Sequence, residues 1–233
     1  MWIALSTCRV YVPGVGADSE PGRSGLRSDA ERNRCRVLAA ARELFAERGL
    51  DVSLVEVARR AGVGNATLHR RFASREELIA AAFAGKMTAY ADAIDTALAD
   101  DDPWRGFTSY IERVCAMQAG DRGFTRVLTL TFPTVKAFEA ERARAYRGVT
   151  ELIARAQQVG RLRPDFTPED VVLVLMANAG VVGATGDEAP DAWRRLVGYL
   201  LQAFAAEAAG PLPEPPTPQR MYRALLRLHR GHR

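Results

Sequence analysis

The chain has 233 residues, of which 48% are hydrophobic and 26% are charged, so it is long enough for a well-buried core and has the composition of a soluble globular protein. Its three cysteines are widely separated and odd in number, which indicates neither a disulfide framework nor a zinc site and favours a reducing cytoplasm. The formal net charge of +4 is uneven: residues 27–86 carry +4, residues 87–210 carry −4 and residues 211–233 carry +4. This asymmetry is typical of a chain in which one segment binds a polyanion while the rest has another task, or of a surface whose charge is merely uneven.

The N-terminal part of the chain predicts a leader followed by a helix-turn-helix. Residues 1–27 contain prolines and glycines without periodicity and read as a flexible leader. Apolar residues recur at helical spacing over residues 28–48, and Gly49 ends that helix. Ser53-Leu-Val-Glu56 is a capping box that opens a second helix over residues 54–61. The turn Ala61-Gly-Val-Gly64 then leads into a third helix over residues 65–72, so residues 28–74 are expected to form a helix-turn-helix domain.

The remainder of the chain predicts a helical body over residues 75–209. Ser74 repeats the capping device before a long helix over residues 75–99, and Asp102-Pro103 caps the next helix, which ends at Gly120. A short segment over 124–132, a long helix over 134–159, an apolar helix over 168–183 and a last core helix within 190–208 follow. Because no period-2 strand pattern persists, the fold class is predicted to be all-α.

Beyond the body, residues 210–218 form a proline-rich linker, and residues 219–233 form a basic tail. Met221, Leu225 and Leu228 give the tail the spacing of one more amphipathic helix. Its basic face is either a solvated surface or a weak contact with DNA or a partner.

The helix-turn-helix region contains a longer series of motifs in a fixed order. The motifs are Val37-Leu-Ala-Ala-Ala-Arg-Glu-Leu-Phe-Ala-Glu-Arg-Gly49, Ser53-Leu-Val-Glu-Val-Ala-Arg-Arg-Ala-Gly-Val63, Thr67-Leu-His-Arg-Arg-Phe72 and Ser74-Arg-Glu-Glu-Leu78. Across residues 34–82 these motifs resemble the N-terminal domain of the TetR family of bacterial transcriptional regulators. The resemblance implies a DNA-binding regulator, by default a repressor, with a helical C-terminal domain that dimerises and encloses a small-molecule pocket.

The resemblance also implies which residues contact double-stranded operator DNA. Ser53 and Arg75 stand where the family contacts phosphate, and His69 replaces the usual tyrosine beside the DNA backbone. An asparagine amide can read adenine, and arginines neutralise phosphates, while Leu68 and Phe72 are expected to seat the recognition helix in the core. The predicted DNA-binding residues are Ser53, Gly64, Asn65, Ala66, Thr67, His69, Arg70, Arg71 and Arg75.

The apolar stripes of residues 168–183 and 190–208 are wider than burial within one subunit needs, which predicts a four-helix interface in a homodimer. Two recognition helices related by a two-fold axis would read a palindromic operator. The residues predicted for this interface are Val171, Val174, Leu175, Val182, Trp193, Leu196, Val197, Leu200, Leu201 and Phe204.

The body also offers residues for an effector pocket. The ligand is expected to be apolar or aromatic, because no cluster of charges points inward, and it would release the operator by favouring one of two conformations. The two amides are the favoured polar contacts, because a buried amide needs a partner. The candidates are Trp104, Phe107, Tyr110, Ile111, Val114, Met117, Gln118, Phe124, Leu128, Phe132, Phe138, Tyr146, Met176 and Asn178.

Other function classes fit the sequence less well. The chain has no phosphate-binding glycine loop, no HExxH or GxSxG motif and no histidine in the body, so neither an enzyme nor a cofactor or metal site is expected. The alternative is a thiol redox-sensing regulator that uses Cys35, which lies among arginines, or Cys115. The longest apolar run, Val171–Val182, is too short to span a membrane, so a cytoplasmic protein without a membrane partner is expected.

Overall fold

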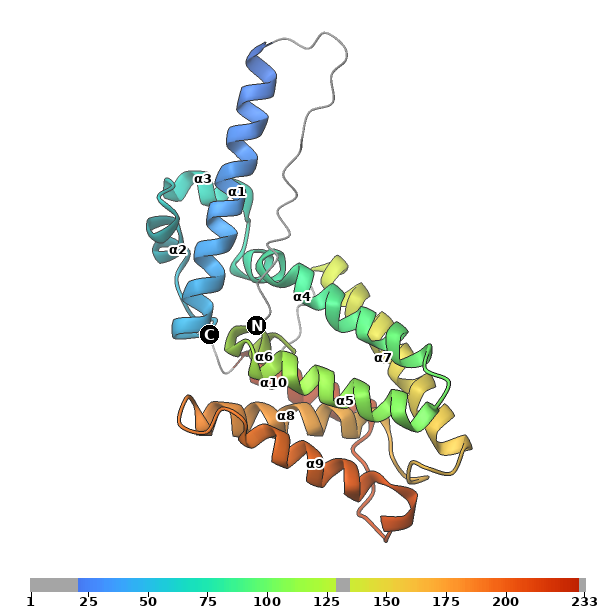
Figure 1. The fold of residues 1–233 in the computed structure, drawn as a ribbon. Helices are drawn as coiled ribbons and strands as arrows, with labels where there is room; N and C mark the ends of the chain where they lie inside the picture. Colours follow the sequence, from blue (N-terminus) through green and yellow to red (C-terminus); the bar gives the residue numbers. More distant parts are fainter. Residues whose placement is uncertain (1–20, 129–134, 231–233) are drawn as a thin grey trace.

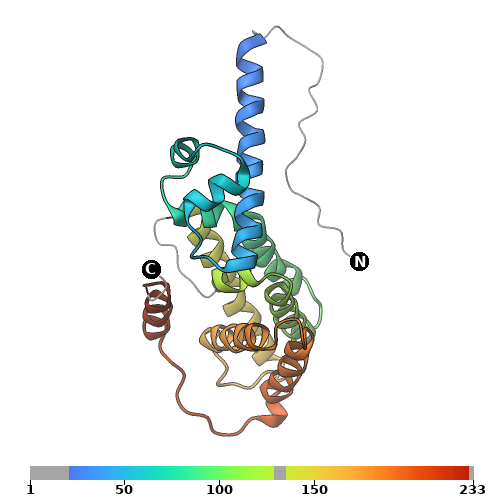
Figure 2. The same cartoon turned by 90° about the vertical axis from the view of Figure 1, so that its left-hand side faces the viewer.

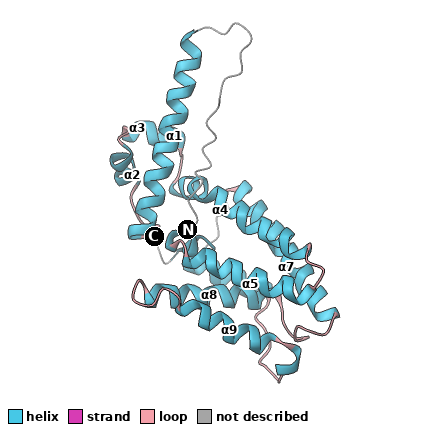
Figure 3. Ribbon diagram, in the orientation of Figure 1, coloured by secondary structure: helices cyan, strands magenta, loops and turns pink. Residues whose placement is uncertain are grey.

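A computed structural model describes residues 21–128 and 135–230, and over these residues regular structure is almost entirely helical (Figure 3). No strand occurs in that part of the chain, where a single isolated bridge pairs Leu162 with Ala205. The predicted all-α fold is therefore confirmed.

The N-terminal domain consists of α1 (Pro21–Arg48), α2 (Leu54–Ala61) and α3 (Asn65–Arg71). Figure 1 shows that α1 continues well past the level of α2 and α3. Residues 21–27 of the predicted leader instead belong to α1, and residues 1–20 of that prediction lie outside the described residues. Proline is well tolerated in a first helical turn, where its missing N–H has no helical partner to lose.

In the body, α8 lies beside α9 and α4 lies beside α7. The helix α10 lies at the end of a long connection (Figures 1 and 2). The short helix α6 starts two residues before the predicted segment, and residues 129–134 of that prediction lie outside the described residues. The body helices are α4 (Arg75–Leu98), α5 (Pro103–Ala119), α6 (Arg122–Leu128), α7 (Lys136–Gln158), α8 (Pro168–Thr185), α9 (Ala192–Phe204), the 3₁₀ turn η1 (Ala206–Ala208) and α10 (Pro218–Arg230).

The predicted helix starts use the expected capping chemistry, with one difference. Asp102 accepts hydrogen bonds from the N–H groups of residues 104 and 105 at 2.9 and 3.1 Å, and Thr167 and Asp170 form a capping box. At α4, Ser74 Oγ accepts the Glu77 N–H at 3.1 Å, but the Glu77 carboxylate accepts the N–H of Ala73 at 2.8 Å and not that of Ser74. This start is therefore capped by the serine without the reciprocal bond.

An aromatic stack joins the N-terminal domain to the body. Phe83 of α4 lies 6.1 Å from Phe45 of α1 and 6.3 Å from Phe124 of α6, measured between ring centroids. All three rings are 1% exposed or less. Beside the stack, Lys86 of α4 forms an ion pair with Asp121, whose carboxylate also accepts the N–H of Phe124 at 2.9 Å. The two domains consequently share one hydrophobic core.

We expect Gly123→Ala to lower the free energy of unfolding by about 1–3 kcal/mol, because its Cβ would lie 2.8 Å from Phe83 Cζ in a ring that has no room to move. Urea denaturation followed by circular dichroism measures this change. Gly120→Ala is the matched control, since Gly120 has a negative φ and its Cβ would meet nothing closer than 3.4 Å. Equal stabilities for the two variants would contradict the tight packing at Gly123.

Candidate functional site

The turn between α2 and α3 depends on a glycine in the left-handed conformation. Gly62 has φ of 63°, and its N–H donates to Arg59 O at 3.2 Å while the Val63 N–H donates to Ala58 O at 3.0 Å. Glycine adopts this conformation without the steric penalty of a Cβ, so α2 ends abruptly. Gly64 then forms the N-cap of α3, and the two helices make a helix-turn-helix.

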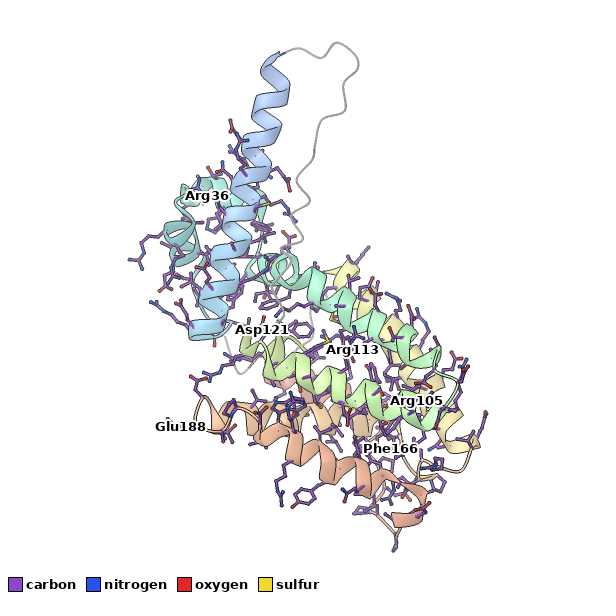
Figure 4. The ribbon with its side chains drawn as sticks, viewed as in Figure 1. Arg36, Arg105, Arg113, Asp121, Phe166 and Glu188 are labelled. Carbon is purple, nitrogen blue, oxygen red and sulfur yellow. The ribbon has the colours of Figure 1, made fainter. Side chains whose placement is uncertain are left out.

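Arg36 of α1 fastens this turn to the first helix. Its Nη2 donates to Ala61 O at 2.6 Å and to Gly62 O at 2.9 Å, and Figure 4 labels it where α1 passes the helix-turn-helix. Carbonyls at a helix C-terminus lack helical partners, so a guanidinium placed there satisfies them. Arg36 was not among the predicted residues, because no local motif signals a contact that spans 25 residues.

The recognition helix α3 is seated by two apolar residues. Leu68 is 1% exposed and Phe72 is 3% exposed, and the Arg34 guanidinium lies 5.6 Å from the centroid of the Phe72 ring. Both residues play the seating role expected from the sequence. The remaining predicted residues lie on the outer surface of the turn and helix: Gly64, Asn65, Ala66, His69, Arg70 and Arg71 are exposed, and Thr67 is half-buried.

Ser53 is occupied by the capping box of α2. Its Oγ donates to Glu56 Oε2 at 2.9 Å and accepts the Glu56 N–H at 3.2 Å. The backbone N–H of Ser53, which donates to Glu56 Oε2 at 3.2 Å, and the Ser53 hydroxyl both lower the pKa of the Glu56 carboxyl. The Ser53 hydroxyl can therefore donate to a DNA phosphate only if it gives up its hydrogen bond to Glu56 Oε2.

Arg75, the first residue of α4, is held by Asp51 in the loop after α1. Its Nη2 donates to Asp51 O at 3.2 Å, and its Nη1 lies 3.8 Å from Asp51 Oδ1. The other carboxylate oxygen of Asp51 lies 3.5 Å from Arg126 Nη2 of α6. Asp51 consequently connects the helix-turn-helix, the start of α4 and α6.

A cavity of about 440 Å³ lies in the body between α7, α8 and α10. Tyr90 of α4 and Leu128 at the end of α6 complete its walls, so it touches both helices that pack on the N-terminal domain. Its lining residues are Tyr90, Leu128, Glu139, Arg142, Ala143, Tyr146, Arg147, Val149, Pro168, Glu169, Val171, Val172, Leu175, Pro218, Met221, Tyr222 and Leu225.

Most of the predicted pocket residues lie elsewhere. Leu128 and Tyr146 line the cavity, whereas Phe132 lies outside the described residues. Gln118 and Asn178 bond each other at 2.8 Å within the core, so neither amide lines this cavity. The core also holds Phe107, Tyr110, Ile111, Val114, Phe124 and Phe138 as buried residues, and Trp104, Met117 and Met176 as half-buried ones.

The predicted interface residues divide into buried and half-buried groups. Val171 and Leu175 face the cavity, and Val174, Val182, Trp193 and Val197 are buried by their own chain. Leu196, Leu200, Leu201 and Phe204 are half-buried.

Outside these positions, the exposed residues of α8 are apolar or glycine, whereas α9 exposes Tyr199 together with Arg194, Arg195 and Gln202. Leu173 is 44% exposed and Tyr199 56% exposed. A Cβ added at Gly180, Gly183 or Gly198 would meet no atom within 4 Å. By length and composition α8 is also apolar enough to cross a membrane, a test that core helices of soluble proteins pass as well.

Comparison with protein families identifies both parts of the chain. The model of bacterial regulatory proteins of the TetR family matches residues 37–82, and the model of the SbtR-like C-terminal domain of transcriptional regulators matches residues 102–203. The chain belongs to the TetR family. No curated protein matches it.

Solved structures of TetR-family regulators are similar along most of the chain. A TetR transcription regulatory protein from Mycobacterium vanbaalenii is 28% identical, with 77% of this chain and 99% of that one covered and a TM-score of 0.47. The fatty acid degradation regulator FadR from Bacillus halodurans is 17% identical, with 72% of this chain and 95% of that one covered and a TM-score of 0.54. FadR from Bacillus subtilis, solved with stearoyl-CoA, is 16% identical, with 76% of this chain and 100% of that one covered and a TM-score of 0.52. At these identities the two FadR structures show a common fold.

Membership of the TetR family makes the chain a transcriptional regulator with a helix-turn-helix DNA-binding domain and a helical C-terminal domain. Regulators of this family are generally soluble, non-enzymatic DNA-binding proteins. Among residues 21–128 and 135–230, no group of three or more His, Cys, Asp or Glu side chains is arranged to hold a metal ion.

Of the two cysteines considered for redox sensing, Cys35 is disulfide-bonded, which corrects the expectation of no disulfide, and Cys115 is poorly placed for that role in this TetR-family body. It is 0% exposed, and burial raises the pKa of its thiol to about 12. Because the thiolate is the reactive form, this cysteine is protonated and shielded at neutral pH.

We expect Cys115 to resist alkylation by iodoacetamide at pH 8 in the native protein and to react fully once the protein is unfolded in urea, because unfolding restores both access and an ordinary pKa. Peptide mass spectrometry resolves the modification of each cysteine. Rapid labelling of Cys115 in the native state would show that the α5 core opens.

Proposed function

We propose that this TetR-family regulator is a homodimeric repressor that binds a palindromic operator through α3 and leaves it when a small molecule occupies the cavity. One observation carries the DNA-binding part: the polar residues of α3 are presented outward on a helix whose inner side is fixed by Leu68 and Phe72. A helix of this kind enters the major groove with its first residues at the base edges.

Base reading is assigned to the start of α3. Asn65 carries the donor and acceptor that adenine matches in the major groove, and Thr67 adds a hydroxyl and a methyl. Arg70, Arg71 and Arg75 supply the positive charge that contacts phosphates, from which most of the affinity arises. His69 is assigned to the DNA backbone.

Two connections support the coupling of the cavity to the operator. The cavity touches α4 at Tyr90, and α4 packs through Phe83 onto α1 of the DNA-binding domain. It also touches the end of α6 at Leu128, two residues from Arg126, which reaches Asp51. If α4 and α6 take two positions that differ in operator affinity, a ligand that binds more tightly to one of them shifts the protein toward it. The change in operator affinity is then limited by the ratio of the ligand's affinities for the two positions.

Selection of bound sites from random DNA is expected to yield a palindrome with half-sites about one helical turn apart or somewhat more. On the selected site, Asn65→Ala should lower discrimination at one or two base pairs by about 1–3 kcal/mol, because the bidentate contact is lost. Arg71→Gln should weaken binding to all sequences and reduce the slope of log affinity against log salt by about one. Fluorescence anisotropy at several salt concentrations measures both effects.

Arg113→Gln is the control for these variants, since Arg113 is an exposed arginine of α5 in the body (Figure 4). It should leave affinity, specificity and salt slope unchanged. An Asn65→Ala protein with wild-type specificity would remove Asn65 from base reading, and an unchanged salt slope for Arg71→Gln would remove Arg71 from phosphate binding.

The uncovered surface of α8 and α9 is assigned to the dimer. The open space at Gly180 and Gly183 lets a second copy approach α8 closely, and burial of Leu173 and Tyr199 would favour the isologous four-helix arrangement.

We expect Gly180→Glu to shift the protein from dimer to monomer, because it places a charge at the point of closest approach. Light scattering coupled to size exclusion at micromolar concentration measures the mass. Arg113→Glu tests whether a new carboxylate elsewhere on the surface has the same effect, and it should remain dimeric. A wild-type monomer, or a dimeric Gly180→Glu protein, would contradict this interface.

A further inference from the structure

The C-terminal helix α10 forms one apolar wall of the cavity, although it follows a long exposed connection. Residues 207–217 are exposed except for a half-buried Pro216, so little of the connection rests on the body. On α10, Met221 is 7% exposed and Leu225 is 8% exposed, and both line the cavity. The tail that the sequence left without a role is therefore docked at this site.

The rest of the cavity lining is mainly aliphatic and carries no net charge. Two carboxylates, Glu139 and Glu169, are matched in number by two guanidiniums, Arg142 and Arg147. A charged ligand would lose its hydration here without a net opposite charge to replace it, so the lining favours an uncharged molecule. The aliphatic residues of α6, α7 and α8 that line the cavity are Leu128, Ala143, Val149, Val171, Val172 and Leu175.

Three of the four charged groups are satisfied without a ligand. Arg142 donates to Leu128 O at 3.1 Å and to Val127 O at 3.2 Å, at the C-terminal end of α6. Its Nε also lies 3.7 Å from Glu139 Oε1. Arg147 is exposed, so water hydrates its guanidinium. None of these groups needs a contact from the occupant of the cavity.

Glu169 differs from the other three because it is both nearly buried and short of donors. It is 6% exposed, and its Oε1 accepts a hydrogen bond from the Tyr146 hydroxyl at 3.2 Å. Among the described residues it has no ion-pair partner and no second hydrogen-bond donor. A carboxylate can accept about four hydrogen bonds, and burying one without donors is costly. The Glu169 carboxylate therefore offers an acceptor to a molecule in the cavity.

We propose that the cavity binds an uncharged, mainly aliphatic molecule with a hydroxyl group that donates a hydrogen bond to Glu169. This inference rests on the proposed function, since it names the ligand class of the same effector cavity. The hydrocarbon part lies against the apolar residues of α8 and α10, such as Leu175 and Leu225.

Competition with water makes the hydroxyl group decisive. When water fills the cavity, it can supply a donor to the Glu169 carboxylate. A ligand that displaces this water without replacing its donor leaves a nearly buried carboxylate unsatisfied, and the penalty reduces its affinity. An alcohol replaces the donor, whereas an ether of the same size does not.

Isothermal titration of the full-length protein without DNA tests the ligand class with two isomers, 1-octanol and heptyl methyl ether. They contain the same atoms and differ in one hydrogen-bond donor. Octanol is expected to bind about tenfold more tightly, which is the effect of one hydrogen bond to a charged acceptor. Octanoate and octylammonium, which have the same chain length, should both bind more weakly than octanol, because the lining has no net charge to compensate for their lost hydration.

The role of Glu169 is tested in the same titration with Glu169→Gln, which keeps the size of the side chain and removes its charge. It should weaken octanol about three- to tenfold and leave the ether within about twofold, since only octanol donates to this group. A purely structural effect would weaken both isomers. Glu112→Gln is the matched control, because Glu112 is an exposed glutamate of α5 outside the cavity lining, and it should bind both isomers as the wild type does.

The apolar wall of α10 is tested with Leu225→Ala. This variant should weaken both isomers by the same factor, because Leu225 contacts the hydrocarbon part and not the polar end. Circular dichroism measures whether each variant remains folded. The comparison of the two isomers on the wild-type protein tests the donor without any substitution, so it stands even if a variant does not fold.

Any of five results would overturn the proposal: no binding of octanol, an ether that binds as tightly as octanol, tighter binding of octanoate or octylammonium than of octanol, unchanged octanol affinity in folded Glu169→Gln, or unchanged affinity for both isomers in folded Leu225→Ala. All of these are read without DNA. Octanol that binds as expected but leaves operator affinity unchanged would instead contradict the repressor mechanism and leave the ligand class standing.

Discussion

The packing of Phe83 between Phe45 and Phe124 is the constraint on which the rest of this molecule depends. Through it the first turns of α4 belong to the core of the DNA-binding domain, while Ala91 and Ile94 further along are buried in the body. A close-packed interior transmits displacement because it has few voids to absorb it. A shift of α4 or α6 in the body therefore changes the position of the helix-turn-helix, and the two domains do not respond independently.

The DNA-binding surface combines local and distant interactions. The Gly62 turn and the Ser53–Glu56 capping box shape α2 and its end within a few residues. Arg36 and Asp51 then fix that unit to α1, α4 and α6 through contacts between distant parts of the chain. The residues proposed to contact the operator contribute little to this scaffold, since Asn65, Arg70 and Arg71 are exposed. Their identity can accordingly change with the operator while the scaffold stays the same.

The sequence predicted features that depend on neighbouring residues. Such features include the helices themselves, the N-cap at Asp102 and the burial of Leu68 and Phe72. Each depends on residues within one or two helical turns, and the structure confirms them. The cavity was largely missed because its walls depend on which face of α7 meets α8 and on where α10 returns after the linker. Gln118 and Asn178 were recognised as buried amides that need partners, but a pattern along the chain could not show that they satisfy each other. Likewise, a pattern along the chain could not show that Val171 and Leu175, which were predicted for a dimer interface, face the cavity.

The exposed connection before α10 determines how its docking responds to concentration. Because α10 is tethered by residues 209–217, its local concentration at its own cavity is on the order of millimolar, whatever the amount of protein present. A separate peptide of the same sequence would have to exceed that concentration to compete. The docking of α10 at the cavity is thus set by the tether and does not vary with the protein level in the cell.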